Sequence, residues 1–168
     1  MKKALVAFAG VATLAGCAAP PTVVQLGPFD AAAAQRQLAP GTNAIRGSAF
    51  LRQLGGGVVT CAGAVVSLVP ATTYAQRMYQ ALYGTDLGPA QHTGGAFNVT
   101  PKSDEFGQLV KKTQCDAQGN FAFERVADGD FFVETTVSWV VGGVTNGGPI
   151  MRRVAVSGGA TTSVVVAP

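Results

Sequence analysis

Residues 113–139 constrain the fold of this chain more than any other stretch. They contain an Asp-Ala-Gln-Gly turn at residues 116–119, where the aspartate can accept hydrogen bonds from the following backbone and the glycine can adopt a positive φ. Phe121 and Phe123 then alternate with polar or small residues, and a second turn at residues 127–130 leads into a longer alternating run. Period-two alternation broken by short turns is typical of neighbouring antiparallel strands. The stretch therefore predicts a β meander.

Strand patterns on both sides extend this meander. Residues 43–53 and 58–69 precede it, separated by three glycines, and Pro70 ends the second run because proline cannot donate a hydrogen bond to a sheet. Residues 149–156 and 161–166 follow it. Short strands joined by closely spaced turns are typical of sandwiches, so we predict an all-β sandwich of about seven strands.

Two segments have helical spacing instead. Residues 30–39 begin with an aspartate that can act as N-cap and end before a Pro-Gly pair, which predicts a short helix. Residues 73–84 begin with a Thr-x-x-Gln capping box and end at a glycine, which predicts a second helix with an extended edge strand as the alternative. The expected apolar face of this helix consists of Tyr74, Met78 and Leu82. Residues 85–103 show no periodicity and are predicted to form a long loop.

The N-terminus has the plan of an export signal. Two lysines precede an apolar run at residues 4–14, which is too short to span a bilayer core of about 30 Å. The run ends in Leu-Ala-Gly-Cys17, which resembles a bacterial lipobox. We therefore expect residues 1–16 to be a lipoprotein signal peptide and Cys17 to carry acyl chains that anchor the protein to a membrane. An ordinary secretory signal with a chance cysteine is the alternative.

The same resemblance implies a location in the bacterial cell envelope. Ala18 follows the cysteine where lipoproteins of the inner membrane often carry aspartate, which favours the outer membrane, facing the periplasm. We interpret residues 17–42 as a tether with a short helix and residues 43–168 as one domain. Removal of Lys2 and Lys3 with the signal lowers the net charge from +3 to +1, and a nearly neutral domain argues against a nucleic-acid partner.

The other two cysteines fit an oxidising compartment. With Cys17 assigned to the lipid, Cys61 and Cys115 remain as an even pair, which predicts a disulfide. The bond would close a loop of about fifty residues and stabilise the fold by roughly 4 kcal/mol in the chain-entropy model.

Several of these segments resemble a known family. Residues 47–70, which end in Ala-Gly-Ala-Val-Val-Ser-Leu-Val-Pro, look like the opening strands of carboxypeptidase regulatory-like domains. Cys-Asp-Ala-Gln-Gly-Asn-Phe-Ala-Phe at 115–123 and Val-Ala-Asp-Gly-Asp-Phe-Phe-Val at 126–133 continue the likeness. Such domains are similar to transthyretin (prealbumin), a Greek-key β-sandwich. The resemblance covers about residues 43–167, apart from the segment between Pro70 and Lys112, and implies an accessory or adhesion-like module without an active site.

No residue pattern indicates a catalytic, cofactor or metal site. His92 is the only histidine. A Cys61–His92 dyad would need a free thiol, whereas Cys61 is expected to form the disulfide. Transthyretin-like hydroxyisourate hydrolases rely on several histidines and a Tyr-Arg-Gly-Ser ending, whereas this chain ends in Val-Val-Val-Ala-Pro. A zinc site would need a His/Cys cluster. Calcium could be bound weakly by four acidic residues, but turn formation explains their presence more simply. They are Asp104, Glu105, Asp128 and Asp130.

We therefore expect a non-catalytic envelope lipoprotein with a structural or binding module. A carbohydrate- or peptidoglycan-binding module is the alternative, and a hydrolase is a distant one. Residues 71–111 hold all three tyrosines, so we expect an envelope protein or a glycan to contact this insertion through Tyr79 and Tyr83. Together with Tyr74 and Trp139 they could form a stacking surface; packing in the core is the other interpretation, and we favour it for Tyr74.

Overall fold

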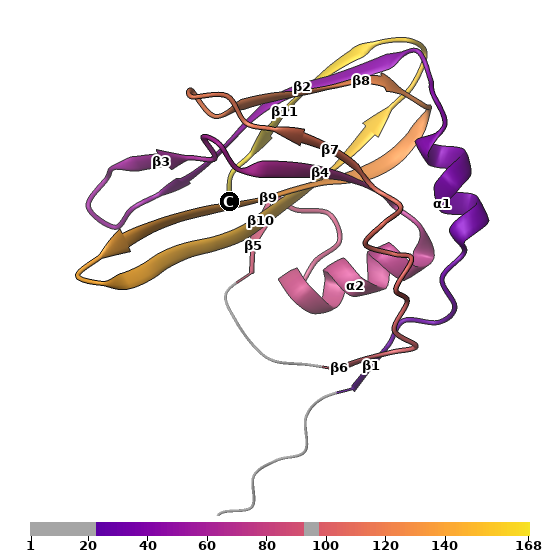
Figure 1. The fold of residues 1–168 in the computed structure, drawn as a ribbon, viewed down its shortest axis with the longest axis horizontal. Coiled ribbons are helices and arrows are strands. Elements are labelled where there is room, and N and C mark those ends of the chain that lie inside the picture. Colours follow the sequence, from indigo (N-terminus) through magenta and orange to yellow (C-terminus); the bar gives the residue numbers. More distant parts are fainter. Residues whose placement is uncertain (1–22, 93–97) are drawn as a thin grey trace, which may run out of the picture.

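The computed structural model describes residues 23–92 and 98–168, which form a β-sandwich with two helices (Figure 1). The prediction of an all-β sandwich is confirmed. The described residues contain eleven strands rather than about seven, because several short pairings are added to the sandwich. The lipobox and Cys17 lie outside these residues. Among the helices that the structure describes, none has both the length and the apolar character needed to cross a bilayer.

One layer is a five-stranded antiparallel sheet with the order β5-β10-β9-β4-β7. Its centre is a long hairpin of two thirteen-residue strands, whose pairing runs from Gly129↔Val156 to Val141↔Val144. The strands of this sheet are β4 (Val65–Pro70), β5 (Ala90–Gln91), β7 (Lys111–Gln114), β9 (Gly129–Val141) and β10 (Val144–Val156).

The second layer is built around β2 (Asn43–Arg52). This strand pairs in parallel with β11 (Thr161–Val166) and antiparallel with β8 (Asn120–Val126), and its last residues pair with β3 (Val58–Thr60). Gly47 lies where β2 crosses the core, and a Cβ there would come within 2.6 Å of the Phe121 ring. A larger residue at this position would therefore clash with Phe121 of β8 and Val164 of β11, the two strands that pair with β2.

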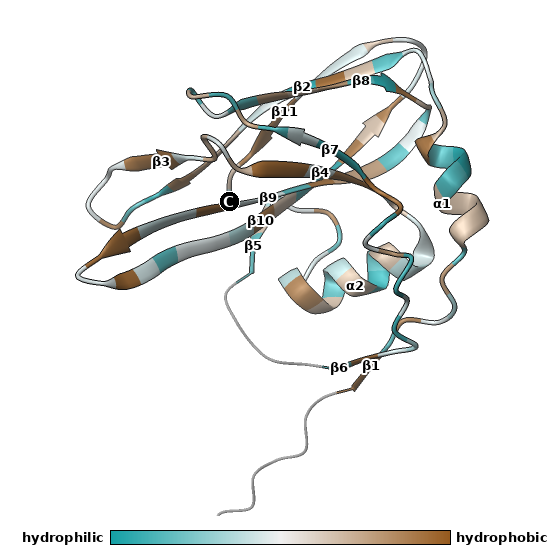
Figure 2. Cartoon of the chain, viewed as in Figure 1, coloured by the Kyte–Doolittle hydropathy of each residue, from teal (hydrophilic) through white to brown (hydrophobic). Residues whose placement is uncertain are grey.

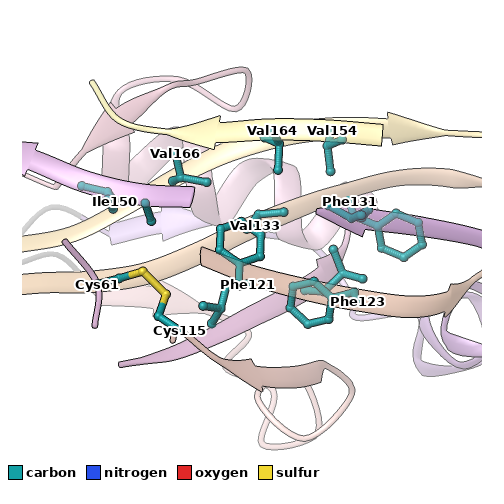
Figure 3. Close-up of a cluster of buried hydrophobic side chains, with 14 of the residues drawn as sticks. Cys61, Cys115, Phe121, Phe123, Phe131, Val133, Ile150, Val154, Val164 and Val166 are labelled. Atoms are coloured by element: carbon teal, nitrogen blue, oxygen red, sulfur yellow. A yellow bond between two sulfur atoms is a disulfide. The ribbon is translucent and has the colours of Figure 1, made fainter. Parts of the chain in front are cut away.

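Alternating residues of both sheets meet in the main core (Figure 3). Phe121, Phe123, Phe131 and Val133 are buried there, as the meander pattern predicts. The turn before β8 also forms as expected, since Asp116 accepts backbone hydrogen bonds from Asn120 at 2.8 Å and from Gln118 at 2.9 Å. These bonds, above all the one from Asn120, lower the pKa of the Asp116 carboxyl.

The predicted disulfide is confirmed. Cys61 and Cys115 are bonded in the core, with Cα atoms 5.8 Å apart, and they join the segment after β3 to the end of β7. The single strand predicted at residues 58–69 is wrong, because the chain turns at residues 61–64 between β3 and β4. Gly63 has φ of +75° there, and its amide donates to the Cys115 carbonyl. The turn moves the chain from one layer to the other, so one continuous strand is excluded.

Much of the predicted tether is folded against the sandwich. β1 (Val23–Gln25) pairs in parallel with β6 (Asn98–Thr100), and Leu26 is buried directly after it. Helix α1 (Ala31–Leu38) begins at the expected N-cap, where the Asp30 carboxylate accepts the Ala33 amide at 2.8 Å. From Val23 onward this segment is therefore packed structure.

Candidate functional site

Within residues 71–111, the segment singled out as the functional insertion, a helix and the side chains of Phe106 and Val110 cover the outer face of the five-stranded sheet. Helix α2 (Thr73–Tyr83) lies on the side of that sheet away from the β2 layer (Figure 1). It forms as predicted, but its N-cap is Thr72, whose hydroxyl accepts the Ala75 amide at 3.3 Å, and it ends at Gly84 with φ of +72°. The predicted long loop at 85–103 contains the short strands β5 and β6.

The apolar face of α2 differs from the predicted one. Met78 and Leu82 are only partly buried, whereas Tyr74, Ala75 and Tyr79 are buried. Two of these three, Ala75 and Tyr79, belong to a second core formed with side chains on the outer face of the sheet, which are Val69, Phe132 and Met151, and with Ala71. The face of α2 that carries Ala75 and Tyr79 therefore packs against the sheet and covers its apolar outer side.

Tyr79 belongs to this second core. Its ring stacks on Phe132 with centroids 4.2 Å apart and an interplanar angle of 10°, and only 2% of the residue is exposed. A partner cannot reach a side chain buried in this way, so the expectation that Tyr79 anchors a partner is wrong. Tyr74 is also 2% exposed, which confirms the expectation that it packs in the core.

Glu134 binds both of the tyrosines that were expected to contact a partner. The Tyr79 hydroxyl donates to one carboxylate oxygen at 2.7 Å, and the Tyr83 hydroxyl donates to the other at 2.6 Å. Burial, reinforced by the negative charge of Glu134, raises the pKa of both hydroxyls, so they remain protonated donors. Tyr83 is half-buried and stacks parallel to Tyr79 at 5.6 Å. The pair holds α2 on the sheet.

Four other residues considered for chemistry have structural partners, namely Cys61, His92, Asp128 and Asp130. Arg153 donates to Asp130 at 2.8 Å and to Asp86 at 3.2 Å, and Asp128 accepts from the Asn43 side chain at 2.8 Å. Cys61 has no free thiol, and the His92 ring meets the edge of Tyr83. Within residues 23–92 and 98–168, no group of three or more His, Cys, Asp or Glu side chains could hold a metal ion.

A polar cleft of about 760 Å³ lies between α1, α2 and the turn that follows β1. Sequence reasoning did not find it, because α1 was assigned to a tether and the cleft forms only when residues 26–37 meet residues 71–77. The side chains that line the cleft include two arginines, two aspartates, two glutamines and two threonines. They are Arg36, Arg77, Asp30, Asp128, Gln37, Gln76, Thr72 and Thr73.

The lining groups of this cleft are only partly used by the fold. Arg77 donates to the Leu26 carbonyl at 3.2 Å, and Gly27, with φ of +75°, leaves room for that guanidinium because a Cβ would lie 3.0 Å from it. Gln76 donates to the Ala71 carbonyl at 2.8 Å. By contrast, the side-chain oxygen of Gln37 is buried and has no hydrogen-bond partner among the described residues. Gln37, which lines the cleft, thus has a buried acceptor that the described residues do not satisfy.

A second hollow, of about 690 Å³, lies on the outer face of the β2 layer. Its floor is formed by small residues, Gly47, Ser48, Ala122 and Ser163, and Arg46 stands at its side. Arg46 forms an exposed ion pair with Glu124 at 2.9 Å. The polar groups at this hollow belong to exposed pairs and turns, so it lacks the buried unsatisfied group found between the helices.

The comparisons with known proteins concern the fold. No protein-family model matches the chain, and no curated protein matches it. A Pseudomonas aeruginosa protein with a proposed carbohydrate-binding role has a similar solved structure, with a TM-score of 0.67 and 22% identity over 84% of this chain and 99% of that one. A second solved structure is the dioxygenase domain of a dioxygenase carbohydrate-binding protein fusion from Streptomyces sp. SirexAA-E. The match covers 94% of this chain and 95% of that one at 10% identity, and its TM-score of 0.34 is too low to indicate a shared fold. The chain shares the β-sandwich fold of the Pseudomonas protein.

Proposed function

We propose that this protein is a non-catalytic, lipid-anchored binding module of the bacterial cell envelope, and that it binds a carbohydrate in the cleft between α1 and α2. The anchor is the acylated Cys17, which places the module at the outer membrane facing the periplasm. The scaffold is a carboxypeptidase regulatory-like domain, in accordance with the sequence motifs. The carbohydrate-binding role proposed for the Pseudomonas protein of similar fold supports this class of ligand.

The buried oxygen of Gln37 carries the proposal. A buried acceptor without a partner costs about 1–3 kcal/mol, so a turn of the Gln37 side chain that brings this oxygen to a ligand donor in the cleft recovers this free energy on binding. A sugar hydroxyl or an acetamido N–H is such a donor. Hydroxyls both donate and accept, which suits a lining that mixes arginines with aspartates and amides. The two aspartates at the same cleft make a phosphate-rich ligand a poorer match because they would repel it.

The test measures binding of two probes by isothermal titration calorimetry. The probes are a soluble peptidoglycan disaccharide and a neutral glucan oligosaccharide, each added to the lipidated protein in detergent. Gln37→Leu removes the buried acceptor and Arg36→Ala removes a lining donor. Loss of one hydrogen bond worth about 1.4 kcal/mol lowers affinity about tenfold, and we expect a loss of this size from each variant.

Arg46→Ala, in the hollow on the other sheet, is the matched control and should bind as the wild type does. Circular dichroism checks that each variant is folded; Gln37→Leu should be at least as stable as the wild type because it removes an unpaired buried group. Loss of binding in Arg46→Ala with full binding in both cleft variants would move the site to the second hollow. Failure of the folded wild type to bind either probe would contradict the proposed ligand class.

A further inference from the structure

Two hairpins extend from the end of the sandwich opposite α1 (Figure 1). β4 pairs with β9 only as far as Thr135, whereas the pairing of β9 with β10 continues to Val141↔Val144. The end of this hairpin is therefore a two-stranded ribbon that projects beyond the sheet. The β2–β3 hairpin ends at the same side of the molecule, and β3 lies beside β9. We call the two ends together the hairpin tips, residues 52–58 and 138–146.

The hairpin tips carry most of the large apolar side chains that the described chain exposes. Nine such side chains have high exposure, and five of them are here, namely Leu54, Val58, Val140, Val141 and Val144. Figure 2 shows the apolar end of the β9–β10 ribbon. The three ribbon valines are 60–67% exposed. A concentration of apolar side chains at one end of a domain marks an interaction surface rather than the random scatter found on most surfaces.

The charges around the tips indicate what this surface contacts. Residues 50–60 contain a single charged side chain, Arg52, and residues 135–149 contain none. Trp139 lies in the ribbon, half-buried against the main core. Apolar side chains with an aromatic residue and a cation, and without acidic groups, match the interfacial region of a bilayer with anionic lipids.

We propose that the hairpin tips are a membrane-contact surface that rests in the interfacial layer of a lipid bilayer. The inference depends on the proposed lipid anchor, because five exposed side chains of this size bind a bilayer only transiently by themselves. Cys17 precedes Val23, the first residue of β1, by six residues, which span at most about 20 Å when fully extended. A tether this short keeps the whole domain, and with it the hairpin tips, at high effective concentration next to the membrane.

The native chain contains its own probe for this contact, since Trp139 is the only tryptophan. The full lipidated protein is reconstituted into phosphatidylcholine and phosphatidylglycerol vesicles with and without brominated acyl chains. We expect the emission of Trp139 to be quenched by the brominated lipid and to shift to shorter wavelength when vesicles are added. Replacing the ribbon valines (Val140→Ser, Val141→Ser, Val144→Ser) should abolish the quenching while the protein still floats with the vesicles.

The matched control replaces two exposed valines elsewhere, Val65→Ser and Val165→Ser, and should keep the wild-type quenching. A wild-type protein that floats without quenching, or a ribbon variant that is quenched like the wild type, would overturn the membrane contact and leave the anchor in place. A wild-type protein that does not float would overturn the anchor as well. If cross-linking instead joins the tips of two copies on the vesicles and quenching is absent, the surface is a contact between protomers.

Discussion

Removing the Tyr79 hydroxyl tests whether Glu134 holds α2 on the sheet. Tyr79→Phe keeps the ring that stacks on Phe132 and deletes one donor to the carboxylate. Hydrogen bonds to charged groups contribute about 1.5–3 kcal/mol, and this one is buried, so we expect the free energy of unfolding to fall by about 2 kcal/mol. Tyr83→Phe should cost less, about 1 kcal/mol, because water can reach that half-buried position and replace the donor.

A double-mutant cycle separates this bond from general packing. In a Glu134→Ala background the Tyr79 hydroxyl has lost its acceptor, so Tyr79→Phe should then be nearly neutral. Urea unfolding followed by circular dichroism gives the four free energies at neutral pH. Equal losses from Tyr79→Phe in both backgrounds would refute the reasoning, since the hydroxyl would then contribute nothing through Glu134.

Three further predictions concern pH, the disulfide and the N-terminus. The pKa values of Tyr79 and Tyr83 are raised in the folded state, so the two hydroxyls stabilise the fold fully below the ordinary tyrosine pKa of 10.0. This stabilisation is lost as the pH rises through the raised pKa values. The free energy of unfolding should therefore fall above pH 10, and it should fall less steeply in Tyr79→Phe and Tyr83→Phe. Reducing Cys61–Cys115 opens a loop of 54 residues and should lower stability by about 4 kcal/mol, which urea unfolding with and without reductant measures; an unchanged midpoint would contradict it. Mass spectrometry of the membrane-extracted protein should show an N-terminal peptide acylated at Cys17, and Cys17→Ser should block maturation, whereas a soluble wild-type protein with another N-terminus would exclude the anchor.

The core of the sandwich was predictable because its signals are local. Alternation at Phe121 and Phe123, and again from Phe131 onward, places each residue on one face of a strand without knowledge of its neighbours. The disulfide was predictable because two cysteines remain once Cys17 is assigned to the lipid, and because the expected compartment is oxidising. The strand break at residues 61–64 was missed because the run of small and apolar residues there continues the strand pattern, and only the change of layer interrupts it.

The packing of α2 on the outer face of the five-stranded sheet was not predicted, although one sequence signal for it exists. Phe131, Phe132 and Val133 are consecutive apolar residues, and an unbroken apolar run is typical of a strand that is covered on both faces. Such a strand requires a second layer of cover, which α2 supplies through Tyr79. The cleft had no comparable signal, because its two walls are far apart in the sequence and each is an ordinary polar helix face.

The parallel pairing of β11 with β2 has a consequence for how the protein folds. Ala44 pairs with Thr161 and Ala49 with Val166, so the strand that begins the sandwich is completed by the last strand of the described chain. Until those residues are available, β2 lacks one of its neighbours and the core lacks Val164 and Val166. Contacts between such distant residues slow folding, because the loop between them must close before the pairing is gained. We therefore expect the sandwich to be completed only after β11 has been synthesised.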